Sequence, residues 1–420
     1  MQNLRINKAR LEKNLFELAK IGKNEHGGID RALGSDADYE ARKWLQDYWE
    51  KKLGIPARLD AIANMWVKRP GTEDLAPIVI GSHHDAVPDG GMYDGALGVL
   101  GATEILQTMI ENHIQTRHPI EVVSFTGEEP NPYNVSTLGS KVLSGRLVTE
   151  DLKKLSSYLD GSSLAACIAH VGGNIEQADS ARIHPGDICA FIELHIEQGK
   201  RLYNANLTSA AVNCITGIYR ENITVYGEAN HAGTTIMQDR TDAFLAASEF
   251  ALAYEKIVRN EKRDDVVGTI GYVKVSPNAA SIIPGKVELV MELRCCDEAI
   301  RQRIKAAVTE ITAEIEKERG VRIERKLNLD QKEMWMDRTI VEAVKRGINQ
   351  EGQKPVELVS MAGHDAANMQ RVTKSAMIFV QSIDGKSHCP QEKTDINRIE
   401  ETVNAMLDAV LILDKEMDAI

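Results

Sequence analysis

The first half of the chain alternates between helical and strand-like patterns of apolar residues. Apolar side chains recur at helical spacing in Leu4–Ile21, Trp44–Leu53 and Val99–Ile110, which predicts three helices. Short apolar runs predict buried strands at Ile78–Ile80, Ile120–Phe125 and Ile188–Leu194. Strands that alternate with helices predict an α/β domain in which the helices cover the sheet.

The middle of the chain follows a different pattern. Its predicted order is strand, helix, strand, strand, helix, strand, over Asn222–Tyr226, Asp242–Lys256, Val266–Val275, Lys286–Leu293, Glu298–Arg319 and Val321–Leu327. This β-α-β-β-α-β order is typical of a ferredoxin-like domain. The earlier pattern then resumes with helix Arg338–Gly347, strand Ala376–Val380 and helix Ile399–Leu413. We therefore predict an α/β domain over 1–210 and 329–420, with a ferredoxin-like domain over 211–328 inserted into it.

Composition narrows the class of protein. A chain of 420 residues is long enough for two or three domains. Its net charge of −12 disfavours a partner rich in phosphate, so we expect no nucleic-acid or membrane ligand. No apolar run approaches the ~18 residues of a membrane span, and the first residues lack a signal-peptide pattern. We expect a cytoplasmic protein, and the six scattered cysteines do not indicate a disulfide scaffold.

Histidine and carboxylate side chains follow four of the predicted strands. His83 and Asp85 come directly after the first, and Glu128-Glu129 follow the second. His195 follows the third strand and His388 follows the last. Open α/β sheets place their sites at the carboxyl ends of strands, so these residues predict one site. A nitrogen and oxygen donor set of this kind suits zinc, with manganese, cobalt or nickel as alternatives.

Each of these features also has an ordinary structural interpretation. A histidine after a strand is more often hydrogen-bonded than metal-bound, and adjacent glutamates are usually a solvated loop. The glycine-rich stretch around Asp94 is most often only a turn. The agreement of four strand ends favours the metal site over these interpretations.

Six motifs in this order carry a resemblance to a known family. They are Gly81-Ser82-His83-x-Asp85, Gly90-Gly91-x-x-Asp94-Gly95, Glu128-Glu129, Leu194-His195-Ile196-Glu197-Gln198-Gly199, Gly227-Glu228-Ala229-Asn230-His231-Ala232-Gly233-Thr234-Thr235 and Ser387-His388. With them the chain closely resembles the hydantoinase/carbamoylase branch of the aminoacylase and carboxypeptidase-like two-metal amidohydrolases. That branch includes N-carbamoyl-L-amino-acid hydrolases, allantoate amidohydrolases and β-ureidopropionases, and the resemblance spans nearly the whole chain.

The resemblance implies a phosphorylase/hydrolase-like catalytic domain that holds two divalent metal ions per subunit. One ion would be held by His83, Asp94 and His195, and the other by Asp94, Glu129 and His388, with Asp94 bridging. Asp85 would support His83, and Glu128 would be the general base that takes a proton from the attacking water.

The resemblance also assigns residues to the substrate and a role to the inserted domain. It implies that the inserted domain is a lid and joins two subunits into a homodimer. The substrate-binding residues would be Gln198, His231, Asn278, Arg294, Gly363 and His364. Among these, His231 would also stabilise the oxyanion, and Arg294 would pair with a substrate carboxylate. From the residues alone, His231 is a loop residue, Asn278 a turn former and Arg294 a surface ion-pair partner.

These expectations combine into one predicted activity. We expect a metal-dependent hydrolase of the C–N bond in a linear ureido group on a small carboxylate-bearing substrate, first an N-carbamoyl-L-amino acid. Allantoate or a related ureide is the first alternative, and a dipeptidase or aminoacylase the second. A non-catalytic binding relative would have lost a metal ligand or Glu128, and this chain retains them all.

Overall fold

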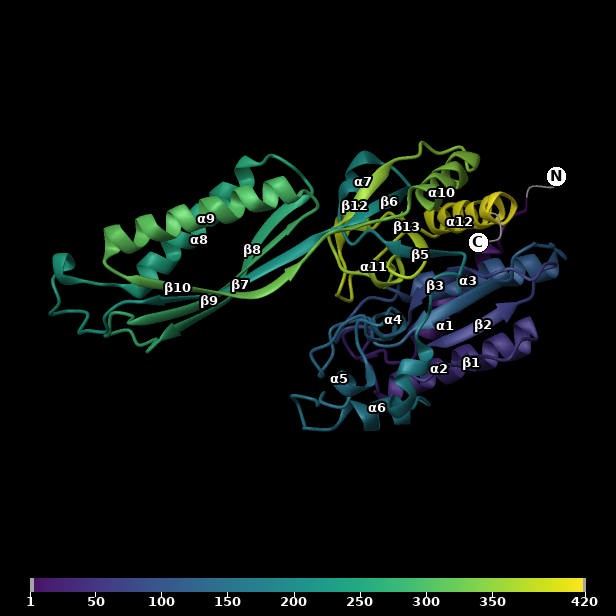
Figure 1. Ribbon diagram of the computed structural model, residues 1–420, viewed down its shortest axis with the longest axis horizontal. Helices are drawn as coiled ribbons and strands as arrows, with labels where there is room; N and C mark the ends of the chain where they lie inside the picture. Colours follow the sequence, from purple (N-terminus) through teal and green to yellow (C-terminus); the bar gives the residue numbers. More distant parts are fainter. Residues whose placement is uncertain (1–3, 418–420) are drawn as a thin grey trace. The chain divides into compact units, whose positions relative to one another are not determined.

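The computed structural model describes residues 4–417, which pack as two units. Unit 1 comprises the residues up to Asn213, Met336–Leu358 and the residues from His364 onward. Unit 2 comprises Cys214–Trp335 together with Val359–Gly363. Figure 1 shows the elements of both units. The chain therefore leaves unit 1 and later returns to it.

The strands of unit 1 form most of a large mixed sheet in the order β1-β2-β4-β3-β5-β13-β6-β11, with β12 paired to β6. Strand β11 and the ends of β6 and β12 fall among the residues of unit 2. The four inner strands β4, β3, β5 and β13 run parallel, and β2 and β6 flank them in antiparallel orientation. The strands are β1 Arg58–Leu59, β2 Met65–Arg69, β3 Ile78–His83, β4 Ile120–Phe125, β5 Ala190–Ile196, β6 Ser209–Ile215, β11 Met334–Trp335, β12 Glu357–Ser360 and β13 Lys374–Val380. Every residue of β3, β4 and β5 is buried, as expected where both faces of a parallel sheet are covered.

Helices cover both faces of this sheet. The side chain of Leu194 packs against Gly101 of α3, where it occupies the space that a larger residue than glycine would need. The next residue back, Glu193, points to the opposite face, where its carboxylate accepts the backbone N–H of Ala366 at the start of α11. The helices of unit 1 are α1 Lys8–Ala19, α2 Asp36–Tyr48, α3 Ala96–Glu111, α4 Leu138–Leu143, α5 Thr149–Leu152, α6 Leu164–His170, α7 Arg201–Ala205, α10 Arg338–Gln350, α11 Ala366–Met369 and α12 Ile396–Glu416, with the π-helical segment η1 Trp49–Leu53 and the 3₁₀ segments η2 Ile175–Ala181 and η4 Ile383–Gly385.

Unit 2 is a four-stranded antiparallel sheet in the order β10-β7-β9-β8. Its elements follow one another as β7 Gly217–Tyr226, η3 Met237–Asp239, α8 Ala243–Asn260, β8 Val266–Ser276, β9 Lys286–Cys295, α9 Glu298–Arg319 and β10 Arg322–Gln331. The helices α8 and α9 lie on the same face of the sheet (Figure 1). Strand β9 alternates strictly between buried and half-buried residues, which is typical of a sheet covered on one face only.

The sequence predicts most of these elements, with displaced ends. The mixed α/β character with a large central sheet is confirmed. The second helix begins at Asp36 rather than Trp44, because Ser35 caps it by accepting the Asp38 N–H. Strands β1, β2, β6, β11 and β12 were not predicted from the apolar pattern, nor were the short helices α4 to α7 and α11. No helix among residues 4–417 is long and apolar enough to cross a membrane.

Candidate metal centre

The sheet order brings four strand ends of unit 1 together. Strands β4, β3, β5 and β13 are neighbours and run parallel, so their carboxyl ends lie at one edge. His83 is the last residue of β3, and His195 is the second-last residue of β5. Glu129 follows β4 after a short loop, and His388 lies in the loop after β13. Side chains that are far apart in sequence therefore meet at this edge.

His83, Asp94 and His195 form the first cluster. Their ligand atoms all lie within 4.8 Å of one another, and the three residues are buried. The Oδ1 of Asp94 is 3.1 Å from the Nε2 of His195 and 3.7 Å from the Nε2 of His83. Asp94 reaches this position from the loop before α3, where Gly95 adopts a positive φ of 63°.

Asp94, Glu129 and His388 form the second cluster. The Nε2 of His388 is 3.4 Å from both the Oδ2 of Asp94 and the Oε1 of Glu129. Asp94 therefore faces the first cluster with one oxygen and the second cluster with the other. A carboxylate shared in this way is suited to bridging two cations.

The hydrogen bonds of the histidines leave their Nε2 atoms directed at these clusters. The Nδ1 of His83 lies 3.1 Å from the carbonyl oxygen of Asp85, and the Nδ1 of His195 lies 3.0 Å from that of Ile196. Since a carbonyl only accepts, each Nδ1 carries the proton and each Nε2 keeps its lone pair for a metal. The Nε2 of His83 and the Oε1 of Glu129 are buried and have no hydrogen-bond partner among the described residues. These orphaned atoms fit a metal ion.

Burial and neighbouring charges shift the pKa values of the acids at this edge of the sheet. Burial alone would raise the pKa of Asp94, but His195, His388 and His83 hold it well below the usual range. Burial and the neighbouring Asp94 raise the pKa of Glu129 to about 7. Crowded carboxylates with histidines between them are the charge pattern that a divalent cation neutralises.

Asp85 and Glu128 lie beside the first cluster. The Oδ1 of Asp85 accepts the backbone N–H of Glu128 at 3.2 Å, and its Oδ2 accepts that of Glu129 at 3.1 Å. Asp85 thus fixes the loop that carries both glutamates, in addition to meeting His83 through its carbonyl. The Oε2 of Glu128 is 3.7 Å from the Nε2 of His83. Burial, with the carboxylates of Glu129 and Asp365, raises the pKa of Glu128 well above its usual value although His83 opposes this.

Two of the predicted substrate-binding residues lie at this edge of unit 1. Gln198 donates from Nε2 to the Oδ2 of Asp94 at 2.7 Å, and its Oε1 is buried without a partner among the described residues. Its backbone has a positive φ of 58°, an uncommon conformation that often marks functional positions. The ring of His364 packs edge-on against that of His195, with centroids 4.5 Å apart. Burial and the nearby His195 lower the pKa of His364 well below its usual value.

The other four lie in unit 2. The Nδ1 of His231 accepts the backbone N–H groups of Gly233 and Thr234, so its Nε2 carries the proton on an exposed ring. Arg294 donates from Nε to the Oε1 of Glu292 at 2.7 Å and from a terminal nitrogen to the carbonyl of Met361 at 2.5 Å. The ion pair considered for Arg294 from the sequence is therefore present.

Asn278 and Gly363 complete the set in unit 2. Asn278 has a positive φ of 59°, which fits the turn expected at this position. A Cβ at Gly363 would meet no atom within 4 Å, so this glycine borders open space.

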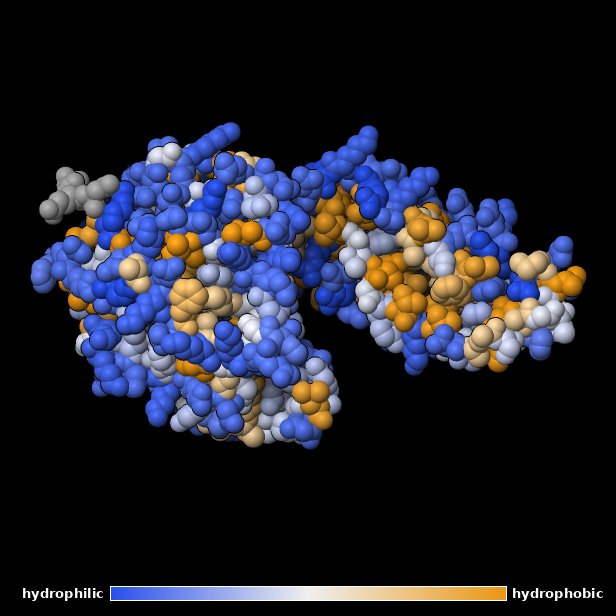
Figure 2. Space-filling model, turned by 180° about the vertical axis from the view of Figure 1, so that it is seen from behind, coloured by the Kyte–Doolittle hydropathy of each residue, from blue (hydrophilic) through white to orange (hydrophobic). Residues whose placement is uncertain are grey.

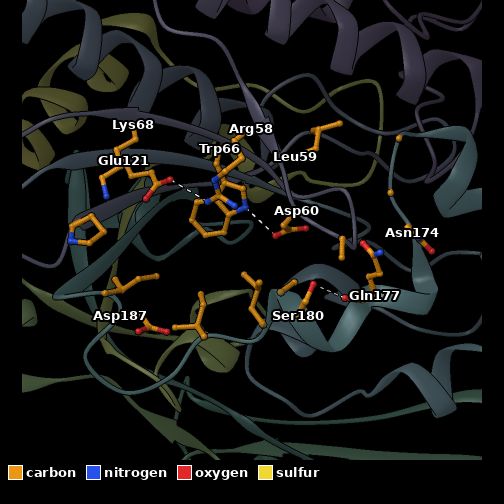
Figure 3. A pocket seen from close by; sticks show the side chains of 18 residues that line it. Arg58, Leu59, Asp60, Trp66, Lys68, Glu121, Asn174, Gln177, Ser180 and Asp187 are labelled. Atoms are coloured by element: carbon orange, nitrogen blue, oxygen red, sulfur yellow. Dashed lines mark hydrogen bonds and ion pairs between the residues drawn. The ribbon is translucent and has the colours of Figure 1, made fainter.

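A separate polar cavity of about 610 Å³ lies over β1, β2 and η2 of unit 1 (Figure 3). Most of its charged side chains have partners within the wall. Arg58 lies over the ring of Trp66 and pairs with Glu121 at 3.2 Å. The carboxylate of Asp60 accepts the indole N–H of Trp66 at 2.9 Å. None of the clustered histidines lines this cavity.

Comparison with known proteins places the chain in a family. Residues 79–412 match peptidase family M20/M25/M40. The chain belongs to this family. The predicted resemblance and the prediction of a hydrolase are thereby confirmed, and the two clusters of candidate metal ligands are in keeping with the family assignment.

Several relatives of this M20-family chain match it over nearly its whole length. An N-carbamoyl-L-amino acid amidohydrolase from Geobacillus stearothermophilus is 35% identical over 384 residues, which cover 91% of this chain and 93% of the relative. A ureidoglycolate hydrolase from Oryza sativa is 33% identical, covering 91% of this chain and 80% of the relative. The crystal structure of an amidase of the hydantoinase/carbamoylase family from Burkholderia multivorans superposes with a TM-score of 0.91 at 32% identity, covering 99% of this chain and all of that one.

Proposed function

We propose that this protein hydrolyses the C–N bond of a linear ureido group on a small carboxylate-bearing molecule, with N-carbamoyl-L-amino acids as the first substrate class. The products are then an amino acid, ammonia and carbon dioxide. The pair of clusters that share Asp94, with the carboxylate of Glu128 beside the first of them, is the observation that carries the proposal. Relatives named for this activity, at 30 to 35% identity over most of the chain, support the substrate class.

The residues at the carboxyl edge of the sheet have distinct roles in the proposed mechanism. His83, Asp94 and His195 would hold one divalent ion, and Glu129 and His388 would hold a second with Asp94. When bound, the two ions lower the pKa of water and polarise the scissile carbonyl. Glu128 accepts the proton of the attacking water and later delivers it to the leaving nitrogen.

Orientation of these groups comes from their neighbours. Asp85 fixes the backbone of both glutamates, so Glu128 stays beside the first cluster while Glu129 faces the second.

The donor set of nitrogen and carboxylate oxygen favours zinc, with manganese, cobalt and nickel as the other candidates. Metal analysis of the purified protein, followed by reconstitution of chelated protein with each ion, identifies the working metal.

A substrate panel tests the proposed activity. Ammonia release is measured from N-carbamoyl-L-amino acids, allantoate and ureidoglycolate, and release of the free amino acid is measured from N-acetyl amino acids and dipeptides. We expect the carbamoyl amino acids to turn over fastest and chelation to abolish turnover. Faster release from allantoate or ureidoglycolate shifts the assignment to that ureide, and cleavage of only N-acetyl amino acids or dipeptides rejects it. No turnover with any of the four metals contradicts the proposal as a whole.

We assign substrate contacts to Gln198, His231, Asn278, Arg294, Gly363 and His364. Arg294 suits a carboxylate because its planar guanidinium donates in a bidentate manner, which lysine does not reproduce. Arg294→Lys is therefore expected to raise KM for carboxylate-bearing substrates more than it lowers kcat. An analogue with a carboxamide in place of the carboxylate is the control, and an equal effect on both compounds contradicts this role.

We further propose that unit 2 acts as a lid of ferredoxin-like topology and joins two copies of the chain. Strand β8 is an edge of its sheet, and edge strands pair readily with another copy. Figure 2 shows hydrophobic side chains gathered on the surface of unit 2. Val267, Tyr272 and Val273 of β8 are exposed, as is Leu252 of the adjoining α8, which is 68% exposed.

Light scattering after gel filtration tests the homodimer. The double variant Leu252→Asp, Val273→Asp is expected to be monomeric, because two buried unpaired charges are costly in a dimer interface. Phe16→Asp on α1, where the side chain is 51% exposed, is the matched control and is expected to remain dimeric. A monomeric wild-type protein at micromolar concentration contradicts the dimer.

A further inference from the structure

Glu392 is a buried acid that connects two loops of the metal centre. It lies just before α12, far in sequence from Asp94. Its Oε1 accepts the backbone N–H of Tyr93 at 2.8 Å and that of Asp94 at 3.1 Å. Its Oε2 lies 3.2 Å from the hydroxyl of Ser387, the residue before His388. One carboxylate therefore touches both loops.

A glycine beside Glu392 leaves the space that its carboxyl group occupies. A Cβ at Gly91 would lie 2.0 Å from the carboxyl carbon of Glu392, so a side chain at position 91 would displace it. The hydroxyl of Ser387 also reaches the Oδ2 of Asp94 at 2.7 Å. Glu392, Ser387 and Asp94 thus form a continuous polar chain behind the second cluster.

We propose that Glu392 is a positioning residue that fixes Asp94 relative to His388 and thereby sets the affinity of the second cluster for its cation. Hydrogen bonds from backbone N–H groups to a carboxylate are among the stronger ones in proteins. His83 and His195 of the first cluster belong to strands β3 and β5, which the sheet holds without Glu392. His388 lies in a loop and its side chain is 46% exposed, so its position depends more on such a link.

The geometry of the second cluster therefore depends on Glu392 more than that of the first cluster does. Loss of the link frees the loop of His388 and lets the Asp94 carboxylate turn, so two ligands of the second cluster lose their positions. The first cluster shares only Asp94 and keeps His83 and His195 in place. Groups that orient metal ligands in this way typically change metal affinity by about 10- to 100-fold. We expect that change in the second site and a much smaller one in the first.

Metal binding by the chelated full-length protein tests this proposal, which concerns cation affinity and uses no substrate. Zinc is titrated by calorimetry, and cobalt by its visible absorption, into the wild type and three variants. Glu392→Ala is expected to keep one tight site and to weaken the other by about 10- to 100-fold. Glu392→Gln retains an oxygen for the two N–H groups and an amide for Ser387, so its geometry and affinities are expected to stay nearer the wild type. Ser387→Ala removes the hydroxyl that contacts both Glu392 and the Oδ2 of Asp94, and it is expected to weaken the second site selectively.

The control is Glu401→Ala on α12, where the carboxylate accepts from Thr208 and Gln353 and lies outside both clusters. It is expected to bind two ions as the wild type does. Two unchanged sites in Glu392→Ala and in Ser387→Ala overturn the proposal, and so does equal weakening of both sites in folded protein. If Glu392→Ala does not fold, Glu392→Asp, whose carboxylate sits on a side chain one methylene shorter, takes its place and is judged by the same outcomes. Because no turnover is measured, an incorrect substrate assignment leaves the result unaffected.

Discussion

Asp38 of α2 is the centre of a buried ion pair, and its replacement by asparagine gives a sharp test of the structure. Its Oδ1 accepts from the Nε of Arg42 and from the Nε2 of His84, both at 2.8 Å, and its Oδ2 accepts the backbone N–H of Gly34 at 2.8 Å. Asp38 and His84 are fully buried. Asparagine has only one acceptor oxygen, so either Gly34 or the pair Arg42 and His84 would face its NH₂ group.

The cost follows from what remains unpaired. Removing one partner of a buried ion pair destabilises a protein by about 3–5 kcal/mol, because the other charge stays buried without compensation. The guanidinium of Arg42 keeps only its bonds to the carbonyl of Ala63 and the hydroxyl of Thr126. We therefore expect Asp38→Asn to lower the free energy of unfolding of unit 1 by about 4 kcal/mol.

Urea unfolding at pH 7 measures this change. Tryptophan fluorescence reports mainly on unit 1, which holds Trp44, Trp49 and Trp66 of the four tryptophans. The matched control is Asp47→Asn in the same helix, where the ion pair with Lys51 is exposed. Such surface pairs contribute about 0–1 kcal/mol. A loss in Asp38→Asn no larger than in the control refutes the reasoning.

The pH dependence gives a second check. Burial alone would raise the pKa of Asp38, but Arg42 and His84 hold it below its usual range. An acid with a lowered folded pKa adds stability that is fully present above its unfolded pKa of about 3.9 and is lost as the pH falls through the folded value. The difference in unfolding free energy between wild type and Asp38→Asn is therefore expected to be equal at pH 6 and pH 8 and to shrink in acid. A difference that grows on acidification contradicts this assignment.

Three further variants address catalysis, close packing and the second unit. Glu128→Gln is expected to lower kcat by about 10²- to 10⁴-fold while metal analysis still finds two ions, since it removes the proposed base and none of the proposed metal ligands. Gly98→Val is expected to destabilise unit 1 by about 1–3 kcal/mol in urea, because a Cβ there would lie 2.3 Å from the carbonyl oxygen of Leu194. Phe250→Ala is expected to cost about 3–5 kcal/mol in the unfolding of unit 2, because this ring is fully buried in its core.

Controls for these variants come from the same chain. Gly271→Val adds the same side chain where a Cβ would meet no atom, and Phe16→Ala removes an exposed ring. Both are expected to leave unfolding nearly unchanged. Retained turnover in Glu128→Gln, or losses in the packing variants that match their controls, contradicts the corresponding prediction.

Much of the secondary structure follows from local patterns. Apolar runs predict β3, β4 and β13, and helical spacing predicts α9 and α12. These patterns are enough to predict the elements, because the spacing of apolar residues follows from burial on one or both faces of a helix or strand. Helix starts are less visible, since the cap at Ser35 precedes the apolar residues of its helix.

Some residues of the candidate site can likewise be predicted from the sequence, and others cannot. Residue type and position after a strand single out His83, Glu129 and His195 without any coordinates. No local signal singles out Glu392, whose partners Tyr93 and Asp94 are about 300 residues away in the chain. The role of Asp85 in fixing the backbone of the glutamates is likewise invisible in the sequence.

The sequence by itself determined which side chains are candidate metal ligands and a candidate base, because histidines and carboxylates after strands are the groups suited to these roles. Only the tertiary structure decided which of them meet. The order β4-β3-β5-β13 sets four separate strand ends side by side, and it presents the two oxygens of Asp94 to different clusters. Strand order depends on pairing between distant segments and on helices packed over both faces of the sheet. Local spacing records neither of these, so the metal centre as a whole exists only in the folded chain.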